Sequence, residues 1–537
     1  MLYSSSFQCK AVSYKNKTLD EIIIFFTFIL YVYQSFFCCC CCIIGCCTSS
    51  IGGKGNCCLR SKSETREMDS KWIVSLKELK KVCYIAAPMV AVMVLLQLLH
   101  VVSVMMVGHL DELSLSGVSI ATSFAIVTGF CFLFGMSGAL ETLCGQAYGA
   151  GQYQKIGTYT YCAIINLIIV CFPIAILWAF TEKILTLIGQ DPAISHVAYK
   201  YALSLIPALF AYAILQALVR YFQTQSLILP MLFSSLAALF FHIPFCWTLI
   251  FKSGLGTIGA ALSIGLSYWL NVILLGFYIK YSSKCDKSRA TLSTEVLQST
   301  RVFFRFAVPS AAMVCLEWWA SEVLIFLSGL LPNPKMEASV LSICFSIISL
   351  HFFIPCGIGA TASTRVANEL GAGNPEAAKL AVWITIVIST VEGVFVSTIL
   401  FFCRYILGYA FSSEKEVVNN VADMVPIMCL QILVDCLQAV LSGVARGCGR
   451  QNTAAFANLG AYYLVGIPVA AVLAFVLHFK VKGLFIGQTT GSSSQVVILG
   501  LVTVFTNWQK QASRARKRML EEDANNETEL TGGNTLA

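Results

Sequence analysis

Two acidic residues lie deep inside apolar stretches of this chain of 537 residues, where a carboxyl group can bind and release protons. Glu317 follows Arg305 by twelve residues, about 18 Å along a helix, and Asp435 lies in the middle of another apolar run. An ionisable side chain is costly at such depth and marks an ion or substrate pathway by default. Because burial disfavours the charged form, such an acid can exchange a proton near physiological pH. We therefore predict that Glu317 and Asp435 couple the chain to protons; the structural alternative is that each only hydrogen-bonds to a neighbouring helix.

Two further acids and two arginines rank below this pair. Glu322 follows Glu317 by five residues, about 140° round a helix, and Glu392 interrupts an apolar run with no evident partner. We expect both acids to be rim or packing groups. Arg365 and Arg446 lie near the ends of expected helices, where snorkelling to the membrane interface predicts a structural role.

Uncharged polar residues inside apolar runs are candidates for substrate contacts. These are Gln97, Asn271, Asn458 and Tyr463, and each can equally make a hydrogen bond that packs two helices together. Pro309 falls inside a further apolar run. Because proline removes a helical hydrogen bond, we predict a hinge there.

Several classes of function are disfavoured by missing motifs. The chain has no Gly-x-x-x-x-Gly-Lys-Ser/Thr loop, which argues against an ATP-driven pump. Its six histidines never take the spacing of a helical metalloprotease. We therefore expect no enzyme activity, no catalytic residue, no metal and no cofactor, with a proton gradient as the energy source. The net charge of +8 is better explained by membrane topology than by nucleic-acid binding.

The elements that must position these residues are membrane-spanning helices. The chain is 57% hydrophobic and 12% charged, with a mean hydropathy of +0.76, which indicates a polytopic membrane protein. A span needs about 20 apolar residues. Twelve such runs occur, near residues 82–107, 117–139, 158–180, 197–219, 227–251, 258–279, 302–328, 339–361, 380–403, 421–443, 454–477 and 484–506. The predicted fold class is therefore an all-α polytopic membrane protein.

The second half of the chain repeats the first. Residues 135–151 and 357–373 match at an offset of 222, and both end in Gly-Ala-Gly, which we interpret as a hinge or packing element. Pro88 and Pro309 are 221 apart, and Arg220 and Arg446 are 226 apart. Six spans per unit return the chain to its starting side, so the two repeats are parallel.

The repeat also locates the acids in one half. At the same offsets, the position equivalent to Glu317 is Leu96, and the position equivalent to Asp435 is Leu209. The halves thus share a scaffold but differ in chemistry, and the ion-handling site should lie in the second half.

Basic residues cluster before the first span, in the mid-chain connector and after the last span, which places both termini in the cytoplasm by the positive-inside rule. The expected organisation is a variable Cys-rich extension (1–71), an N-lobe (72–285), a C-lobe (286–510) and a polar cytoplasmic tail (511–537). Within the extension, residues 22–44 could span the membrane, or lie at its surface with acylated cysteines. The leading interpretation is a non-native or variable extension, and we base no function on it.

The duplicated segments resemble plant multidrug and toxic compound extrusion (MATE) transporters, also called detoxification efflux carriers. The resemblance rests on residues 139–152, 316–319, 328–334, 363–375 and 442–447 and covers about 72 to 510. It implies two six-helix lobes facing a central cavity, and export of an organic cation, xenobiotic or secondary metabolite in exchange for protons. It also implies that the acids matching Glu317 and Asp435 take part in proton coupling, and that an acidic pair used by some bacterial relatives in the N-lobe is not the coupling site here.

Two features depart from the family pattern. The family usually has glycine where this chain has Asp111, and the cysteine-rich start has no counterpart in typical members. We expect a monomer in the plasma or vacuolar membrane whose partners are a small organic substrate, protons and the lipid bilayer, with no nucleic acid. A facilitative, channel-like carrier and a lipid-linked flippase of similar architecture remain alternatives, and the natural substrate stays open.

Overall fold

The structure is a computed structural model that describes residues 62–290, 294–410 and 414–533, and these residues contain helices and no β-strand. The hydrophobic segment 22–44 and the adjoining cysteines lie outside the described residues, so the expectations for them remain predictions. The described helices form two lobes, each built from one half of the chain.

The N-lobe contains the first six spans. Its elements are α2 (Lys62–Val107), α3 (Glu112–Ala125), η1 (Ile126–Phe130), α4 (Cys131–Ser137), α5 (Ala139–Gly149), α6 (Tyr153–Ala179), α7 (Thr181–Leu187), α8 (Pro192–Thr224), α9 (Ile228–Trp247), η2 (Thr248–Lys252) and α10 (Thr257–Tyr281). A connector with η3 (Ser283–Ser288) and α11 (Thr294–Gln298) leads to the second lobe.

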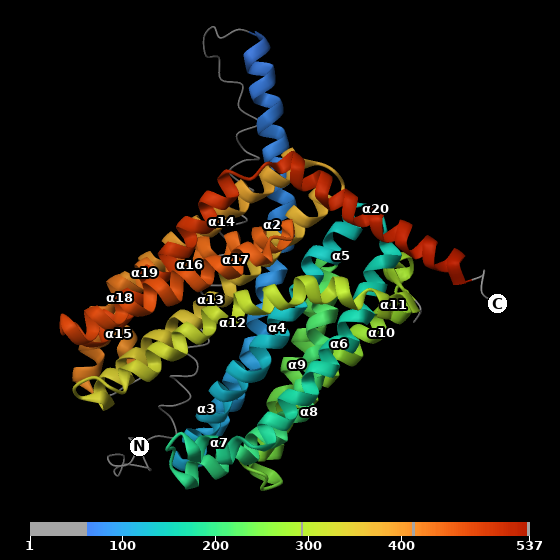
Figure 1. Cartoon of the computed structure of the whole chain (residues 1–537). Coiled ribbons are helices and arrows are strands. Elements are labelled where there is room, and N and C mark those ends of the chain that lie inside the picture. Colours follow the sequence, from blue (N-terminus) through green and yellow to red (C-terminus); the bar gives the residue numbers. More distant parts are fainter. Residues whose placement is uncertain (1–61, 291–293, 411–413, 534–537) are drawn as a thin grey trace.

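The C-lobe contains the remaining spans. Its elements are α12 (Thr300–Ser328), α13 (Pro334–Gly371), α14 (Pro375–Phe402), α15 (Arg404–Leu407), η4 (Gly408–Ala410), α16 (Lys415–Cys448), α17 (Gln451–Asn458), η5 (Leu459–Gly466), α18 (Ile467–Ala471), η6 (Val472–Val476), α19 (Lys480–Val504) and α20 (Trp508–Gly533). The two lobes approach each other near α5 and α20 and diverge toward α7 and α15 (Figure 1).

The span count agrees with the sequence. Within the described residues, eleven helices are long and apolar enough to cross a membrane, and a twelfth is reached if α19 and α20, bent by 84° at their junction, are counted as one span. The predicted twelfth span falls in α19, whose centre (488–495) reads Gln-Thr-Thr-Gly-Ser-Ser-Ser-Gln, and these polar residues lower its hydropathy. The predicted all-helical, two-lobe membrane fold is confirmed.

The first helix of each half packs into the other lobe. The hydrophobic core of the C-lobe includes Val82 and Val90 of α2, and the core of the N-lobe includes Phe303 and Ala311 of α12. Both crossings depend on a glycine of the repeated segment. A Cβ on Gly135 would lie 2.6 Å from the Cα of Ala311, and a Cβ on Gly357 would lie 2.7 Å from the Cα of Val90. Such distances are too short for any larger residue, so these glycines allow the helices to touch.

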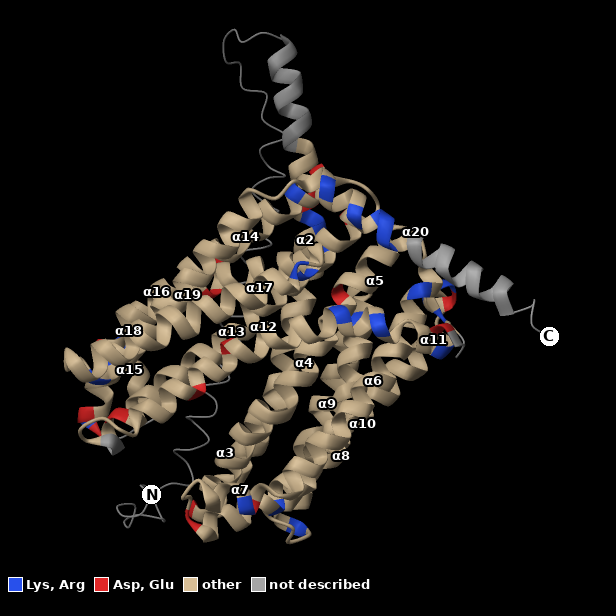
Figure 2. Cartoon of the chain, in the orientation of Figure 1, with Lys and Arg blue, Asp and Glu red and all other residues tan. Residues whose placement is uncertain are grey.

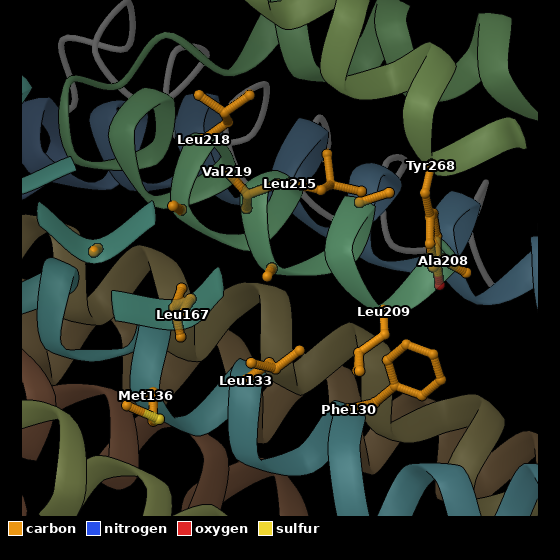
Figure 3. Close-up of a cluster of buried hydrophobic side chains, with 14 of the residues drawn as sticks. Phe130, Leu133, Met136, Leu167, Ala208, Leu209, Leu215, Leu218, Val219 and Tyr268 are labelled. Carbon is orange, nitrogen blue, oxygen red and sulfur yellow. The ribbon is translucent and has the colours of Figure 1, made fainter. Parts of the chain in front are cut away.

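The N-lobe core is apolar where the C-lobe carries acids. Leu209, the repeat equivalent of Asp435, is fully buried and lies beside Phe130 and Leu133 (Figure 3). Leu96, the equivalent of Glu317, packs against the same core. The asymmetry expected from the sequence is therefore present in the folded chain.

Charged residues mark the end at which the lobes meet. Lys and Arg gather there around α2, α20 and α11 (Figure 2). We call this the basic end; the positive-inside rule predicts that it faces the cytoplasm. At the opposite end Asp111 caps α3, since its carboxylate accepts a hydrogen bond of 2.7 Å from the backbone N–H of Ser114. The departure from the family pattern thus supplies a standard helix N-cap.

Candidate functional site

The two predicted acids each receive a hydrogen bond from a glutamine of α16. The Nε2 group of Gln438 donates to Oε2 of Glu317 on α12 over 2.6 Å. About two turns earlier on α16, Nε2 of Gln431 donates to Oδ1 of Asp435 over 2.6 Å. Asp435 is buried and Glu317 is half-buried. A single helix, α16, therefore carries both amides and one of the acids, and its Gln438 reaches the other acid on α12.

More polar side chains from the eleventh and twelfth spans join these four. Gln431 also donates to Oγ of Ser492 over 3.1 Å, and the hydroxyl of Tyr462 donates to Oε1 of Gln495 over 2.8 Å. Tyr462 and Ser492 are themselves 3.2 Å apart, oxygen to oxygen. We call this set the C-lobe polar cluster; it comprises Glu317, Gln431, Asp435, Gln438, Tyr462, Ser492 and Gln495. It lies between α12, α16, η5 and α19, and its amides and hydroxyls can hydrogen-bond a carboxyl group in either protonation state.

Glu392 has a partner that the sequence did not reveal. Its Oε1 lies 3.0 Å from Nε2 of His351 on α13, and its Oε2 accepts a hydrogen bond of 3.3 Å from the thiol of Cys436 on α16. All three side chains are buried, and His351 also interacts electrostatically with Asp435. The atoms of these three side chains that could bind a metal ion lie within 4.8 Å of one another. However, the imidazole N–H and the thiol S–H already donate hydrogen bonds to the carboxylate. We therefore interpret His351 and Glu392 as an ion pair, with a further hydrogen bond from Cys436, next to the C-lobe polar cluster.

The other predicted residues are dispersed. Asn458 is buried and donates to the carbonyl of Met313 over 2.7 Å, and Asn271 is buried and donates to Oγ of Ser235 over 3.3 Å. Both therefore make hydrogen bonds between helices. Tyr463 is half-buried and is the neighbour of the tyrosine that joins the cluster.

Three more candidates lie in α2 and α12. Gln97 is half-buried in α2. Glu322 is half-buried in α12 and makes no hydrogen bond or ion pair within the described part of the chain. Pro309 lies inside α12, where its ring leaves the carbonyl of Arg305 without its helical donor. Their predicted roles in substrate contact and hinge motion stay predictions.

The two repeat-related arginines converge on one glutamate between the lobes. Nη1 of Arg220 on α8 lies 2.9 Å from Oε1 of Glu141 on α5, and Nε of Arg446 on α16 lies 2.8 Å from Oε2 of the same carboxylate. The side chain of Glu141 is fully buried, that of Arg220 is 2% exposed and that of Arg446 is 11% exposed. Arg446 does not reach toward water as expected, because a buried acid of the other lobe holds its guanidinium.

Side-chain amides surround this ion pair and also cross between the lobes. Gln146 donates to the carbonyl of Gly447 over 3.1 Å, and its repeat equivalent Asn368 donates to the carbonyl of Thr224 over 3.1 Å. Gln223 donates to the carbonyl of Ala360 over 3.0 Å. We call these contacts and the Glu141 ion pairs the inter-lobe clasp. It joins α5 and α8 to α13 and α16.

The clasp involves the segments that define the repeat, and part of it could have been predicted from the repeat. Arg220 and Arg446 are repeat equivalents, so their meeting between the lobes follows the repeat. The acid that they share does not, because the repeat equivalent of Glu141 is Ser363. Arg365 differs from Arg446, since it pairs with Glu78 of α2 over 2.7 Å and with Glu369 one turn along its own helix. The contact of Arg365 with α2 also joins the two halves of the chain.

Comparison with known proteins agrees with the duplication and the fold. The MatE family profile matches residues 88–248 and 309–472, one segment in each lobe. Protein DETOXIFICATION 14 of Arabidopsis thaliana is 53% identical over 470 residues, which are 88% of this chain and 96% of that protein. Protein DETOXIFICATION 3 of the same plant is 54% identical over 446 residues, or 83% of this chain and 94% of that one.

Solved structures give the same result. The crystal structure of the eukaryotic MATE transporter AtDTX14 matches with a TM-score of 0.81 at 55% identity, over 83% of this chain and 99% of that chain. A structure described as the outward-facing conformation of a multidrug resistance MATE family transporter matches with a TM-score of 0.72 at 15% identity, over 81% of this chain and 96% of that chain, which indicates a shared fold. This protein therefore belongs to the MATE family of multidrug and toxic compound efflux transporters.

Proposed function

We propose that this transporter is a proton-coupled antiporter that exports organic cations, xenobiotics or secondary metabolites by alternating access. The observation that carries the proposal is the pair of carboxyl groups inside the C-lobe, each with a glutamine amide at 2.6 Å. Acids at such positions in a membrane protein are costly and are retained for ion handling. The relatives named for detoxification agree with substrates of this class.

The glutamines suit a site that gains and loses a proton. Each donates an N–H to the carboxylate, and the Oε1 atoms of Gln431 and Gln438 are buried without a partner in the described part of the chain. After a half-turn of the amide, that oxygen can accept a hydrogen bond from a protonated carboxyl. Both protonation states of Glu317 and Asp435 can thus be satisfied by the same side chains.

The inter-lobe clasp is an argument that this structure is in an outward-facing state. It closes the basic end with buried ion pairs and hydrogen bonds, whereas the lobes diverge toward α7 and α15 (Figure 1). With the basic end in the cytoplasm, substrate would leave from the diverging side. Transport then requires a second state in which the clasp is broken.

Exchange follows if proton and substrate bind to the same transporter with opposing effects. Protonation of Glu317 and Asp435 would change the hydrogen bond that joins α12 to α16 and lower the affinity for a cation between the lobes. By thermodynamic linkage, a bound cation then lowers the affinity for protons by the same factor. Pro309 offers a bending point in α12 for this change.

The test is uptake of a fluorescent or alkaloid cation into proteoliposomes under an imposed pH gradient. Glu317→Gln should abolish gradient-driven uptake, and Asp435→Asn should do the same. Glu322→Gln is the matched control, because this acid lies on the same helix and makes no hydrogen bond within the described chain; it should retain transport.

If uptake proceeds equally without a gradient in all variants, the proposal fails and a facilitative carrier replaces it. If lipid-linked oligosaccharide crosses the bilayer and small cations do not, a flippase replaces it.

A further inference from the structure

The charges buried in the inter-lobe clasp do not balance within the clasp itself. Arg220 and Arg446 supply two guanidinium groups, which remain protonated in proteins, and Glu141 supplies one carboxylate. A buried charge without a counter-ion is strongly destabilising. A second anion is therefore needed to neutralise the clasp.

Glu317 is placed to be that anion through Arg446. Gln438, Ser442 and Arg446 follow each other at four-residue intervals on α16, so they share one face of the helix. Gln438 contacts both Glu317, at 2.6 Å, and Ser442, at 3.5 Å. Glu317 interacts electrostatically with Arg446, and the thiol of Cys356 interacts with both of them.

The same thiol interacts with the other two charges of the clasp, Glu141 and Arg220. The thiol of Cys356 on α13 is thus subject to charges from both lobes. Of the two arginines, Arg446 is the one whose charge acts on Glu317 within the described chain. The remaining titratable groups that act on Glu317 are Asp435 from α16, Cys131 from α4 and Tyr462 from η5.

We propose that Arg446 is a positioning residue that makes Glu317 the second counter-ion of the inter-lobe clasp, so that protonation of Glu317 unlocks the basic end. With Glu317 ionised, two cations face two anions and the clasp is neutral. With Glu317 protonated, one buried guanidinium charge lacks a partner, and opening the lobes to water stabilises it. The proposal rests on the proposed function, since Glu317 must take up the proton.

This direction of the effect is the one that antiport requires. An empty, deprotonated transporter that faces outward must stay closed at the basic end, because otherwise the carrier would return without a proton. The protonated transporter must open there to release the proton and bind substrate. Because Glu317 balances the charge of Arg446 only when it is ionised, this one carboxyl group accounts for both the closed and the open state.

The test compares backbone hydrogen exchange at a single pH, with Glu317→Gln as the mimic of the protonated acid. The purified full chain in lipid nanodiscs is followed by mass spectrometry over residues 139–149 and 440–448, which carry the clasp. In the otherwise native chain, Glu317→Gln should speed exchange in these segments about tenfold, since an uncompensated buried charge favours local opening. In an Arg446→Gln background, Glu317→Gln should have no effect.

Arg446→Lys and Arg220→Gln serve as matched controls. Lysine retains the charge, so Arg446→Lys should preserve the response to Glu317→Gln. Arg220→Gln leaves one cation with two anions, and there Glu317→Gln should slow exchange instead. The proposal is overturned if Glu317→Gln speeds exchange equally in the Arg446→Gln background, or if it changes nothing in the native chain.

The readout needs no substrate and no gradient, so its failure is distinct from a failure of proton-coupled transport. If hydrogen exchange responds as expected but uptake does not depend on the pH gradient, the link between Glu317 and the clasp stands and the antiporter proposal fails.

Discussion

His351 and Glu392 form an ion pair inside the C-lobe that a single substitution would leave incomplete. Both side chains are at least nine-tenths buried, and the imidazole also interacts electrostatically with Asp435. Removing one partner of a buried pair leaves the other charge without compensation, whereas replacing both by apolar residues of similar volume is often neutral. The pair therefore stabilises the surroundings of Asp435 only while both members are present.

We predict that His351→Leu destabilises the folded protein by about 3 to 5 kcal/mol, and that the double variant His351→Leu/Glu392→Leu recovers most of this loss. Thermal unfolding of the detergent-solubilised protein measures both. A double variant as unstable as the single one would show that the pair is held by packing rather than by charge.

The sequence located the acids because acids are rare in apolar runs, and the repeat sharpened the result through Leu96 and Leu209. It did not identify Gln431, Gln438 or Tyr462 as their partners, because uncharged polar residues occur widely in these spans. It also led to the wrong environment for Arg446. Snorkelling is decided by distance to the interface, whereas the buried Glu141 that holds this arginine comes from the other lobe, 305 positions away.

At the scale of elements, the repeated glycines decide how closely the helices of the two halves approach. We predict that Gly357→Ala lowers the stability by about 1 to 3 kcal/mol, as overpacking does, because the new Cβ would meet the backbone of Val90. Gly276→Ala is the control: it is also helical, and a Cβ there meets nothing within 4 Å. Thermal unfolding should rank Gly357→Ala below the native chain and Gly276→Ala level with it or slightly above.

The cap of α3 gives a second prediction at this scale. Asp111→Ala should cost about 1 kcal/mol, whereas Asp111→Gly should cost only a few tenths, because glycine is itself a tolerated N-cap. Thermal unfolding of the two variants distinguishes them. Equal losses would mean that Asp111 acts through its charge rather than as a cap. A small loss for Asp111→Gly would mean that glycine, the usual residue in the family, and aspartate can both act as the N-cap of α3.

At the scale of the whole molecule, the repeat predicts that the acid of the clasp can be moved to the equivalent position in the other half. Ser363 is the repeat equivalent of Glu141 and is likewise buried. We predict that Glu141→Ser reduces gradient-driven uptake at least tenfold, because two buried guanidinium groups lose their shared acid. The double variant Glu141→Ser/Ser363→Glu should restore much of the rate. If the double variant is as slow as the single one, the clasp depends on the exact helix that carries the acid.

The packing of each first helix into the other lobe as well as its own has a consequence for how the chain is made. When the N-terminal half has left the ribosome, the helix that packs against Gly135 has not yet been made, because Ala311 lies 176 positions later in the chain. Neither half can complete its core alone, so insertion of the first six helices yields an unfinished lobe until α12 arrives. The cores of the two lobes are therefore completed together, once the second half of the chain has been made.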